Sequence, residues 1–390
     1  MEKHNILYYT WGENCAADCI DALRRAGCQV YVSCAKRVQY DHDAFFMEQI
    51  AEECEREKAD CIFTFNYFPD LSRVALQLHM DYYSWCYDSP HLTLQSLTLN
   101  NSCNHVYVFD YALYERYAGL GVETIHYLPL ACNTDRVRKQ IRDYRDKREA
   151  QDRNAYEHEI TFLGNMYDDE YNFYDRIGEL PEYITGYLDA TMEAQSQIYG
   201  MDLVRAMLRE DICNTILSKV KIDMGPDYRD CGKDILVSMI QKKITVTERR
   251  RLLTVLGEFY KVDHYAAKES PGLPVRYCGY ADYVNEMPNV FATSKINLNI
   301  SLRSIESGIP LRVIDILCAG GFCLTNYQTE LPMYFENGKS IVWYESYEDL
   351  FEKVHYYLRH EEEREAIAAE GHRIVCSEFT YEKALQTIFS

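Results

Sequence analysis

The sequence predicts an α/β protein with two parallel sheets, each wound on both faces by helices. Short apolar runs alternate with amphipathic stretches of helical length in the first third of the chain, and this alternation resumes in the second half. A chain of 390 residues, 47% of them hydrophobic, is long enough for two cores. Because crossovers between parallel strands are right-handed, this pattern predicts two doubly wound, Rossmann-like domains.

The first domain is predicted to span residues 1–134 and to contain six short strands. The predicted strands are Ile6–Tyr9, Val30–Ser33, Cys61–Phe65, Tyr82–Tyr87, Val106–Asp110 and Ile125–Leu130. The clearest helical patterns are Cys15–Ala26, Ala44–Lys58 and a stretch that runs through Tyr117. In a sheet of this kind, ligands bind beyond the carboxyl ends of the strands.

Residues 135–159 are predicted to link the domains, because Val137 to Tyr156 is highly charged and lacks a strand pattern. The second domain is predicted to span residues 160–375, with a helical insertion at about 180–256. Residues 376–390 are expected to form a C-terminal segment that packs back on the N-terminal domain. The strands predicted in the second domain are Ile160–Leu163, Val262–Tyr265, Val275–Cys278, Ile296–Ile300, Phe322–Asn326 and Ile341–Tyr344.

Charge and composition exclude several classes of protein. The 41 Lys and Arg against 61 Asp and Glu give a net charge of −20, which argues against an exposed nucleic-acid track. No apolar run approaches the roughly 18 residues of a membrane span, and the first residues lack the pattern of a signal peptide. The 15 cysteines show no paired C-x-x-C spacing. These features predict a cytoplasmic protein with reduced thiols and no nucleic-acid partner.

The segment Ser294–Asn326 carries the most chemical information. A predicted strand is followed by a loop, and Ser307-Gly308-Ile309-Pro310 has the composition of a helix start with Ser307 as its cap. The helix ends at Gly320-Gly321. The free N–H groups and positive dipole end of such a helix favour a phosphate, and Gly308 allows a ligand to approach the backbone.

Two arginines near this helix start are predicted to contact a diphosphate. Arg303 and Arg312 are able to make two-pronged contacts with phosphate oxygens. Asp315 lies about one turn after Arg312 and is able to accept hydrogen bonds from ribose hydroxyls. The alternative is an ordinary strand–helix–strand crossover with a surface pair between Arg312 and Asp315.

The segment resembles the donor-binding half of GT-B glycosyltransferases, specifically the CgeB-like group of family-1-type enzymes. The resemblance is close along SKINLNI and GIPLRVIDILCAGGFCLTN. It extends over nearly the whole chain through DSP at 88–90, LPLACN at 128–133, FLGNMY at 162–167, AQSQIYG at 194–200 and RYCGY at 276–280.

The resemblance implies a hexosyltransferase-like enzyme with two Rossmann-like domains facing a cleft. The second domain would hold the donor, a nucleoside-diphosphate sugar, as co-substrate, with no further cofactor and no metal. The first domain would receive an acceptor, which is a glycan, a peptide or protein, or a small molecule. The alternative is a non-catalytic nucleotide-sugar-binding or assembly protein derived from a transferase.

The resemblance also assigns donor residues. Related retaining enzymes carry two glutamates eight positions apart, and Asp315 matches the later one, which holds the ribose. The earlier one falls at Ser307, so the retaining pattern is incomplete. The usual Arg…Lys phosphate pair is replaced by FLGNMYDDE. The expected donor-binding residues are Gly164, Asn165, Tyr280, Lys295, Asn299, Arg303, Ser307, Gly308, Ile309, Pro310, Leu311, Arg312 and Asp315. Tyr280 would stack on the base, or else pack as an ordinary strand-end tyrosine.

The catalytic candidates lie in the first domain. Asp88 and His91 follow the fourth predicted strand in the sequence YDSPH, where Pro90 stops the strand. A carboxylate there would serve as general base toward the acceptor, whereas the alternative is a buried aspartate that caps the following turn. Glu13, Asn14 and Asn66 are expected to contact the acceptor.

A metal site is not expected. The sequence has no H-E-x-x-H and no cysteine pairs at zinc spacing. Its one D-x-D, Asp41-His42-Asp43, directly precedes the second predicted helix, where a helix cap is the expected role.

Overall fold

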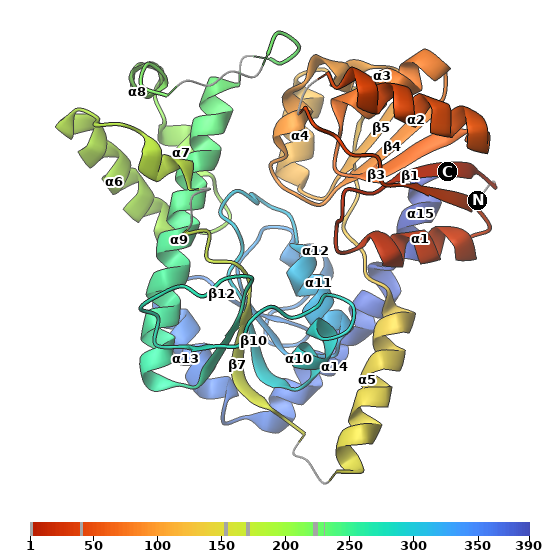
Figure 1. Ribbon diagram of the computed structural model, residues 1–390. Helices are drawn as coiled ribbons and strands as arrows, with labels where there is room; N and C mark the ends of the chain where they lie inside the picture. Colours follow the sequence, from red (N-terminus) through yellow and green to blue (C-terminus); the bar gives the residue numbers. More distant parts are fainter. Residues whose placement is uncertain (1–2, 40–41, 152–154, 169–171, 221–224, 230) are drawn as a thin grey trace. The chain divides into compact units, whose positions relative to one another are not determined.

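The computed structural model describes the chain except for residues 1–2, 40–41, 152–154, 169–171, 221–224 and 230 (Figure 1). The chain divides into two compact units. Unit 1 comprises Met1–Asn133, Asp223–Cys231 and Phe379–Ser390, and unit 2 comprises Thr134–Ile222 and Gly232–Glu378. Each unit contains one six-stranded parallel sheet with helices, which confirms the predicted α/β class.

The sheet of unit 1 has the strand order β2-β1-β3-β4-β5-β6. Its strands are β1 (Asn5–Tyr9), β2 (Gln29–Ser33), β3 (Cys61–Phe65), β4 (Asp81–Cys86), β5 (Asn104–Val108) and β6 (Ile125–Tyr127). The order changes direction between β1 and β3, so a ligand is expected beyond their carboxyl ends. The fifth and sixth strands end two or three residues earlier than predicted, because pairing holds β5 in register with β4 and β6 in register with β5.

Helices cover both faces of the first sheet. They are α1 (Ala16–Arg25), α2 (Ala44–Glu57), α3 (Pro69–Leu78), α4 (Tyr111–Gly119), α15 (Tyr381–Ile388) and the short 3₁₀ turns η1 (Leu92–Gln95) and η2 (Leu97–Asn100). Side chains alternate along each strand, so neighbouring tyrosines separate. Tyr82 enters the core beneath α2 and α3, whereas Tyr83 packs on Phe389, with ring centroids 4.7 Å apart.

The sheet of unit 2 has the order β12-β11-β10-β7-β8-β9. Its strands are β7 (His158–Leu163), β8 (Val262–Tyr265), β9 (Arg276–Tyr277), β10 (Ser294–Asn299), β11 (Cys323–Asn326) and β12 (Val342–Tyr344). Numbered within this unit the order is 3-2-1-4-5-6 read from the other side, which is the order of dinucleotide-binding sheets, and its direction changes between β7 and β10.

The helices of unit 2 include the stretch expected as a linker. They are α5 (Thr134–Glu149), α6 (Glu182–Ser196), α7 (Leu203–Met207), α8 (Glu210–Leu217), α9 (Gly232–Phe259), α10 (Met287–Ala292), α11 (Leu311–Cys318), α12 (Leu331–Tyr334), α13 (Tyr347–Tyr357), α14 (Glu361–Glu378) and the 3₁₀ turn η3 (Phe173–Arg176). Val137 and Ile141 are buried on one face of α5, and the helix packs on α10 and α11. It is therefore a part of unit 2, although its composition is that of a solvated segment.

The helical insertion builds a core of its own. Apolar side chains of α6 to α9, such as Leu188, Ile216 and Leu236, are buried against one another. One part of the predicted insertion belongs elsewhere, since residues 225–229 pack in unit 1. There Arg73 Nη2 contacts Asp227 Oδ2 at 2.7 Å, and Tyr228 forms a bridge with Ser96.

The cysteines are free thiols, and all of them except Cys34, Cys278 and Cys376 are buried. Among the helices that the structure describes, none combines the length and the apolar character needed to cross a membrane.

Candidate functional site

Unit 1 contains a pocket of about 740 Å³ at the carboxyl ends of β1, β3 and β4. This is where the strand order changes direction, as expected for a ligand site. The pocket brings together three residues that the sequence singled out, namely Asn66, Asp88 and His91. Lys36 and Arg37, which sequence reasoning missed, line it too. They follow β2 in a stretch without a recognisable motif.

Asn66 positions Asp88 within this pocket. Asn66 directly follows β3 with a left-handed backbone, φ of 62°, and its Nδ2 donates to Asp88 Oδ2 at 2.7 Å. Its Oδ1 accepts the backbone N–H groups of Tyr87 and Asp88 at 3.2 and 3.3 Å. Asp88 is exposed, and among the described residues its Oδ1 has no hydrogen-bond partner. The alternative of a buried turn-capping aspartate is therefore wrong.

His91 is poised to remain neutral near pH 7. Burial is the largest influence and lowers the pKa of His91, while the neighbouring Asp88 charge acts in the opposite direction. Its Nε2 is buried and has no hydrogen-bond partner among the described residues. A neutral imidazole is able to accept a proton, so the pocket holds a group suited to proton transfer.

Glu13, which was expected to contact an acceptor, is buried, and its carboxylate is occupied by hydrogen bonds within unit 1. It is 5% exposed, and its carboxylate accepts hydrogen bonds from Tyr8 Oη at 2.7 Å, Thr10 Oγ1 at 3.0 Å and the backbone N–H of Trp11 at 3.0 Å. These bonds build the turn after β1 and present Trp11 to the pocket. Asn14 is exposed but does not line that pocket.

Trp11 and Tyr87 form an aromatic platform at the rim of the pocket. Their rings are stacked with centroids 6.0 Å apart, and Trp11 Nε1 donates to the carbonyl of Phe65 at 3.0 Å. Trp11 is 40% exposed, although a tryptophan usually buries most of its surface. An exposed and fixed ring of this kind is suited to packing against a ligand.

The carboxyl edge of the second sheet carries most of the predicted donor residues. Asn299 is buried, and its Nδ2 donates to Ser301 Oγ and Thr325 Oγ1 at 3.0 and 2.9 Å. The backbone N–H of Ser301 donates to Asn326 Oδ1 at 2.8 Å. Asn299 thus helps to fix the loop that leads to α11, and its Nδ2 is occupied by these two hydrogen bonds.

Ser307 is not the cap of α11, contrary to the prediction. The helix begins at Leu311 with Pro310 at its N-cap position and has no side-chain cap. Ser307 Oγ donates instead to the buried carboxylate of Glu330 at 2.7 Å. In the first turn, the N–H of Val313 donates to the carbonyl of Pro310 at 3.0 Å, whereas the N–H groups of Leu311 and Arg312 have no acceptor among the described residues and remain available to an anion.

Arg312 and Asp315 do not form the surface pair that was the alternative interpretation. Arg312 Nη1 lies 2.7 Å from Met287 Sδ, and no ion pair involves Arg312 in the described part of the chain. Asp315 Oδ1 accepts a hydrogen bond from Tyr283 Oη at 3.2 Å. Arg312 therefore offers an uncompensated cation next to the start of α11.

Arg303 is not available to a diphosphate, contrary to the expectation. Its guanidinium donates hydrogen bonds from Nε and Nη2 to the carboxylate of the buried Glu248, both at 2.8 Å. It also donates to the carbonyls of Ser196 and Ile198 at 3.1 and 2.8 Å and lies over the Tyr199 ring at 3.9 Å. Arg303 holds the helical insertion to the loop after β10.

Lys295 lies at the opposite edge of the sheet from most of the other residues predicted to bind the donor. It is the second residue of β10, four residues before Asn299, which at about 3.3 Å per residue places it roughly 13 Å from the carboxyl end. Tyr280 follows β9 and is 58% exposed, so it is not the packed strand-end tyrosine of the alternative interpretation.

Arg249 is a buried cation at the carboxyl edge of the second sheet that sequence reasoning missed. Its Nε donates to the carbonyl of Ile300 at 3.1 Å, and its Nη1 donates to the carbonyl of Asn165. It thereby occupies the point between β7 and β10 where the strand order changes direction. Burial lowers the pKa of Arg249, and the nearby Arg312 acts in the same direction. In the sequence, the arginines of TERRR have the pattern of an exposed helix surface, so the buried position of Arg249 could not be predicted from it.

Gly164 follows β7 at a position that leaves little space for a side chain. A Cβ there would lie 3.1 Å from Phe162 Cζ and 3.6 Å from Arg249 Nη1. Its carbonyl accepts a hydrogen bond from His264 Nε2 at 2.9 Å. Asn165 Oδ1 accepts from the backbone N–H of Ala267 at 3.2 Å. Both residues shape the carboxyl edge beside Arg249.

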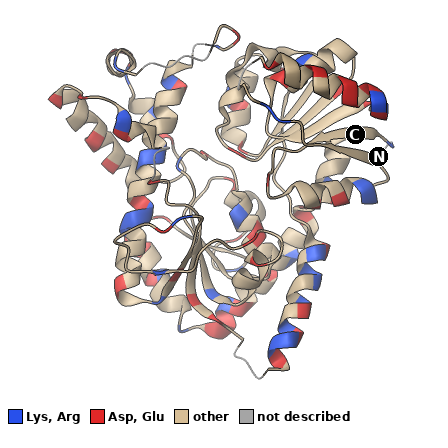
Figure 2. Ribbon diagram, viewed as in Figure 1, with Lys and Arg blue, Asp and Glu red and all other residues tan. Residues whose placement is uncertain are grey.

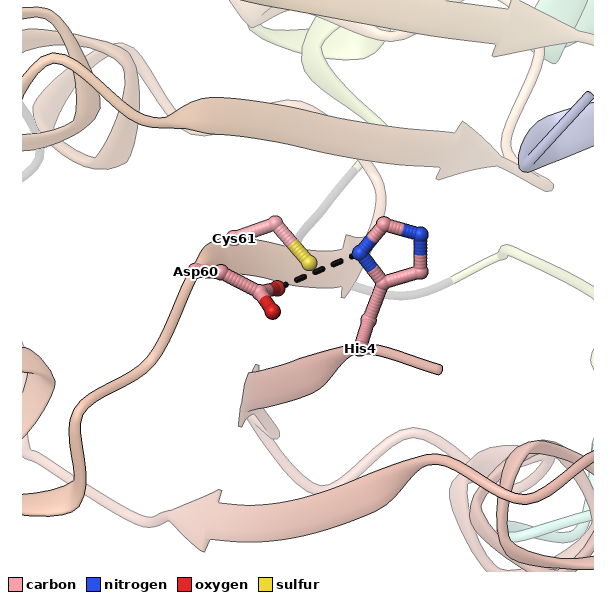
Figure 3. A group of neighbouring side chains, drawn as sticks. All are labelled: His4, Asp60 and Cys61. Atoms are coloured by element: carbon pink, nitrogen blue, oxygen red, sulfur yellow. Dashed lines mark hydrogen bonds and ion pairs between the residues drawn. The ribbon is translucent and has the colours of Figure 1, made fainter. Parts of the chain in front are cut away.

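Two groups bear on metal binding. Asp43 caps α2, as predicted, by accepting from the N–H of Phe46 at 3.1 Å, while Asp41 lies outside the described residues. Figure 3 shows His4, Asp60 and Cys61 close together, with His4 Nδ1 3.3 Å from Asp60 Oδ1. Burial raises the pKa of Cys61, which disfavours the thiolate that a metal ion would require.

Comparisons with known proteins agree with this architecture. Residues 245–390, which contain Arg249, Arg312 and Asp315, match a family model described as glycosyl transferase-like. No curated protein matches the chain. Anabaena Alr3699/HepE in complex with UDP-glucose is 9% identical, with a TM-score of 0.56 over 99% of this chain and 98% of that one.

Two further solved structures resemble the whole chain. A glycosyltransferase from Rickettsia africae is 11% identical, with a TM-score of 0.53 over 100% of this chain and 98% of that one. A sucrose-phosphate synthase from Thermosynechococcus elongatus is 13% identical, with a TM-score of 0.52 over 99% and 97%. The chain has the GT-B fold. The GT-B fold predicted from the sequence is confirmed, whereas the assignment to the CgeB-like group stays a prediction.

Proposed function

We propose that the protein is a glycosyltransferase that moves a sugar from a nucleoside-diphosphate sugar to an acceptor hydroxyl without a metal ion. The glycosyl transferase-like match and the fold shared with a protein in complex with UDP-glucose support a nucleotide-sugar substrate. The observation that carries the proposal is the start of α11, where uncapped N–H groups lie next to the unpaired cation of Arg312.

In this proposal the diphosphate is bound by the first turn of α11 and by Arg312. Arg249 contributes a second positive charge between β7 and β10, where the strand order changes direction. This charge replaces the divalent cation that would otherwise be needed to balance the negative charge of the phosphates. Asp315, which Tyr283 already orients, accepts hydrogen bonds from the ribose. Tyr280 supplies an exposed ring for the base.

The pocket of unit 1 receives the acceptor. Asp88 Oδ1 accepts the proton of the attacking hydroxyl, and Asn66 holds the other carboxylate oxygen in place. The platform of Trp11 and Tyr87 packs against the acceptor.

Calorimetry with UDP, GDP and TDP and with their glucose conjugates tests the donor site. Wild-type protein is expected to bind one of these series, and Arg312→Ala is expected to weaken that binding about 10- to 100-fold, because a hydrogen bond to a charged group is lost. Arg359→Ala, which removes an exposed arginine elsewhere in unit 2, is the matched control and should bind as the wild type does. Absence of binding by wild-type protein to all of them would contradict the proposal.

Hydrolysis of the bound nucleotide sugar separates an enzyme from the alternative of a non-catalytic binding protein. Slow release of free sugar in the absence of an acceptor, followed by chromatography, is the expected result for a transferase, because water replaces the acceptor hydroxyl. Binding without any turnover, with or without candidate acceptors, would favour the non-catalytic alternative.

A further inference from the structure

Unit 2 contains a pocket that lies at the opposite edge of the sheet from the proposed donor site. It has a volume of about 820 Å³ and is formed by α5, the ends of α10 and α11, the start of β10 and α14. Ser294 and Lys295, which line it, are the first two residues of β10. The donor edge is at the other end of that strand, so the two places are separate.

This pocket is basic although the chain as a whole is strongly acidic. Six Lys or Arg side chains line it against three Asp or Glu, whereas the whole chain carries a net charge of −20. Figure 2 shows the positive residues of α5 as blue bands along the helix. Arg138, Arg142 and Arg145 follow one another at spacings of four and three, so they share one face of α5.

Several of these cations have nothing to neutralise them. The side chains of Arg142, Arg145 and Lys295 form no hydrogen bond or ion pair in the part of the chain that the structure describes. The other lining cations are partly compensated, since Arg148 contacts Glu157 and Arg138 lies 3.8 Å from Asp135. The uncompensated charges come from two elements, α5 and β10, that face the same cavity.

Arg364 gives an independent indication of an anionic ligand. It is 1% exposed, lines the pocket, and has no hydrogen-bond acceptor at Nε or Nη2 among the described residues. Its Nη1 donates to the carbonyl of Tyr357 at 2.8 Å, and its nearest carboxylate, the exposed Glu361, lies 3.5 Å from Nη2. A buried guanidinium with idle donors is costly, unless a ligand supplies the acceptors.

We propose that this pocket binds a small ligand carrying two or more phosphate groups. Its volume is that of a small-molecule site, which excludes a nucleic-acid track. Guanidinium groups bind phosphate oxygens in two-pronged fashion, and cations from α5, β10 and α14 surround the cavity as a multiply charged ligand requires. The proposal is independent of the proposed transferase activity.

Titration calorimetry with inorganic pyrophosphate tests the site in an Arg312→Ala background, which removes the proposed donor site as a competitor. One binding event is expected, and adding Arg142→Glu and Arg145→Glu should weaken it at least about tenfold. The matched control is Lys147→Glu with Lys233→Glu, which makes the same charge change on another face of α5 and in α9, and neither residue lines the pocket. This control should change the affinity less than about twofold, because the Debye length at physiological salt is about 8 Å.

Lys295→Gln provides a second variant on a different element, and it should also weaken pyrophosphate binding. ATP is the second probe, and it should bind at least as tightly as pyrophosphate, because it presents three phosphates. No binding of either probe, or equal weakening by the control pair, would overturn the proposal. Citrate that binds as tightly as pyrophosphate would overturn the assignment to phosphate.

Discussion

Asp88 is the residue on which the proposed chemistry depends most. Replacement by Asn keeps the shape and the contact with Asn66 but removes the base, so Asp88→Asn should lower the transfer rate by about 10²- to 10⁴-fold. Donor affinity, measured by calorimetry, should stay unchanged, because Asp88 belongs to unit 1 and the proposed donor residues to unit 2. Asp81→Asn, at the other end of β4, is the matched control and should retain full activity. A rate for Asp88→Asn equal to that of this control would remove Asp88 from the mechanism.

His264 makes the stability of the molecule depend on pH. Burial lowers its pKa below the ordinary value of about 6.5 that it regains on unfolding. As the pH falls through about 6.5, the unfolded chain therefore binds the proton before the folded chain does, and folded-state stability is lost. His264→Gln keeps a donor toward the carbonyl of Gly164 but cannot titrate. Its melting temperature should fall less than that of the wild type between pH 7.5 and pH 5, whereas parallel curves would show that His264 contributes nothing.

At the scale of elements, the ion pair of Arg303 and Glu248 joins the helical insertion to the sheet. Both side chains are buried, with exposures of 7% and 1%. Arg303→Met should destabilise the protein by about 3–5 kcal/mol, because the carboxylate of Glu248 is left buried and unpaired. A fall of about 10 °C in melting temperature is expected.

The double variant Arg303→Met with Glu248→Met should recover most of this loss, because no buried charge remains. Calorimetric melting of the wild type, both single variants and the double variant gives the comparison. An Arg303→Met protein that melts like the wild type but no longer binds nucleotide would restore the donor role predicted from the sequence.

The same elements show how far the sequence could be interpreted. The alternation of short apolar runs with amphipathic helical stretches predicted both sheets. Strands such as Cys61–Phe65 form such runs because they are buried on both faces, and they end at turn residues. The pattern GIPLRV indicated the start of α11, because Pro fixes φ and is favoured at the start of a helix. The partners of Arg303 and Ser307 could not be predicted, since Glu248 and Glu330 are distant in sequence and become neighbours only through packing. The charged surface of α5 similarly hid its two buried apolar residues.

At the scale of the whole molecule, the chain returns to unit 1 at its end. The backbone N–H of Cys132 donates to the carbonyl of Phe379 at 2.9 Å, and Tyr107 Oη donates to the carbonyl of Ile388 at 3.3 Å. Apolar side chains of α15 and the residue after it are almost fully buried, namely Tyr381, Leu385, Ile388 and Phe389. The fold of unit 1 thus depends on residues that follow all of unit 2 in the sequence.

Removal of residues 379–390 should therefore unfold unit 1 while leaving unit 2 intact. Burying each large apolar side chain contributes about 1.5–3 kcal/mol, so the four together contribute an amount comparable with the whole stability of a domain, about 5–15 kcal/mol. Limited proteolysis and calorimetry of the truncated chain should show cleavage confined to unit 1 and one remaining melting transition. Addition of a synthetic peptide of residues 379–390 should restore protection, whereas a peptide with Tyr381→Ser and Leu385→Ser should not. Protection of unit 1 in the truncated chain without any peptide would show that the sheet and its other helices are sufficient.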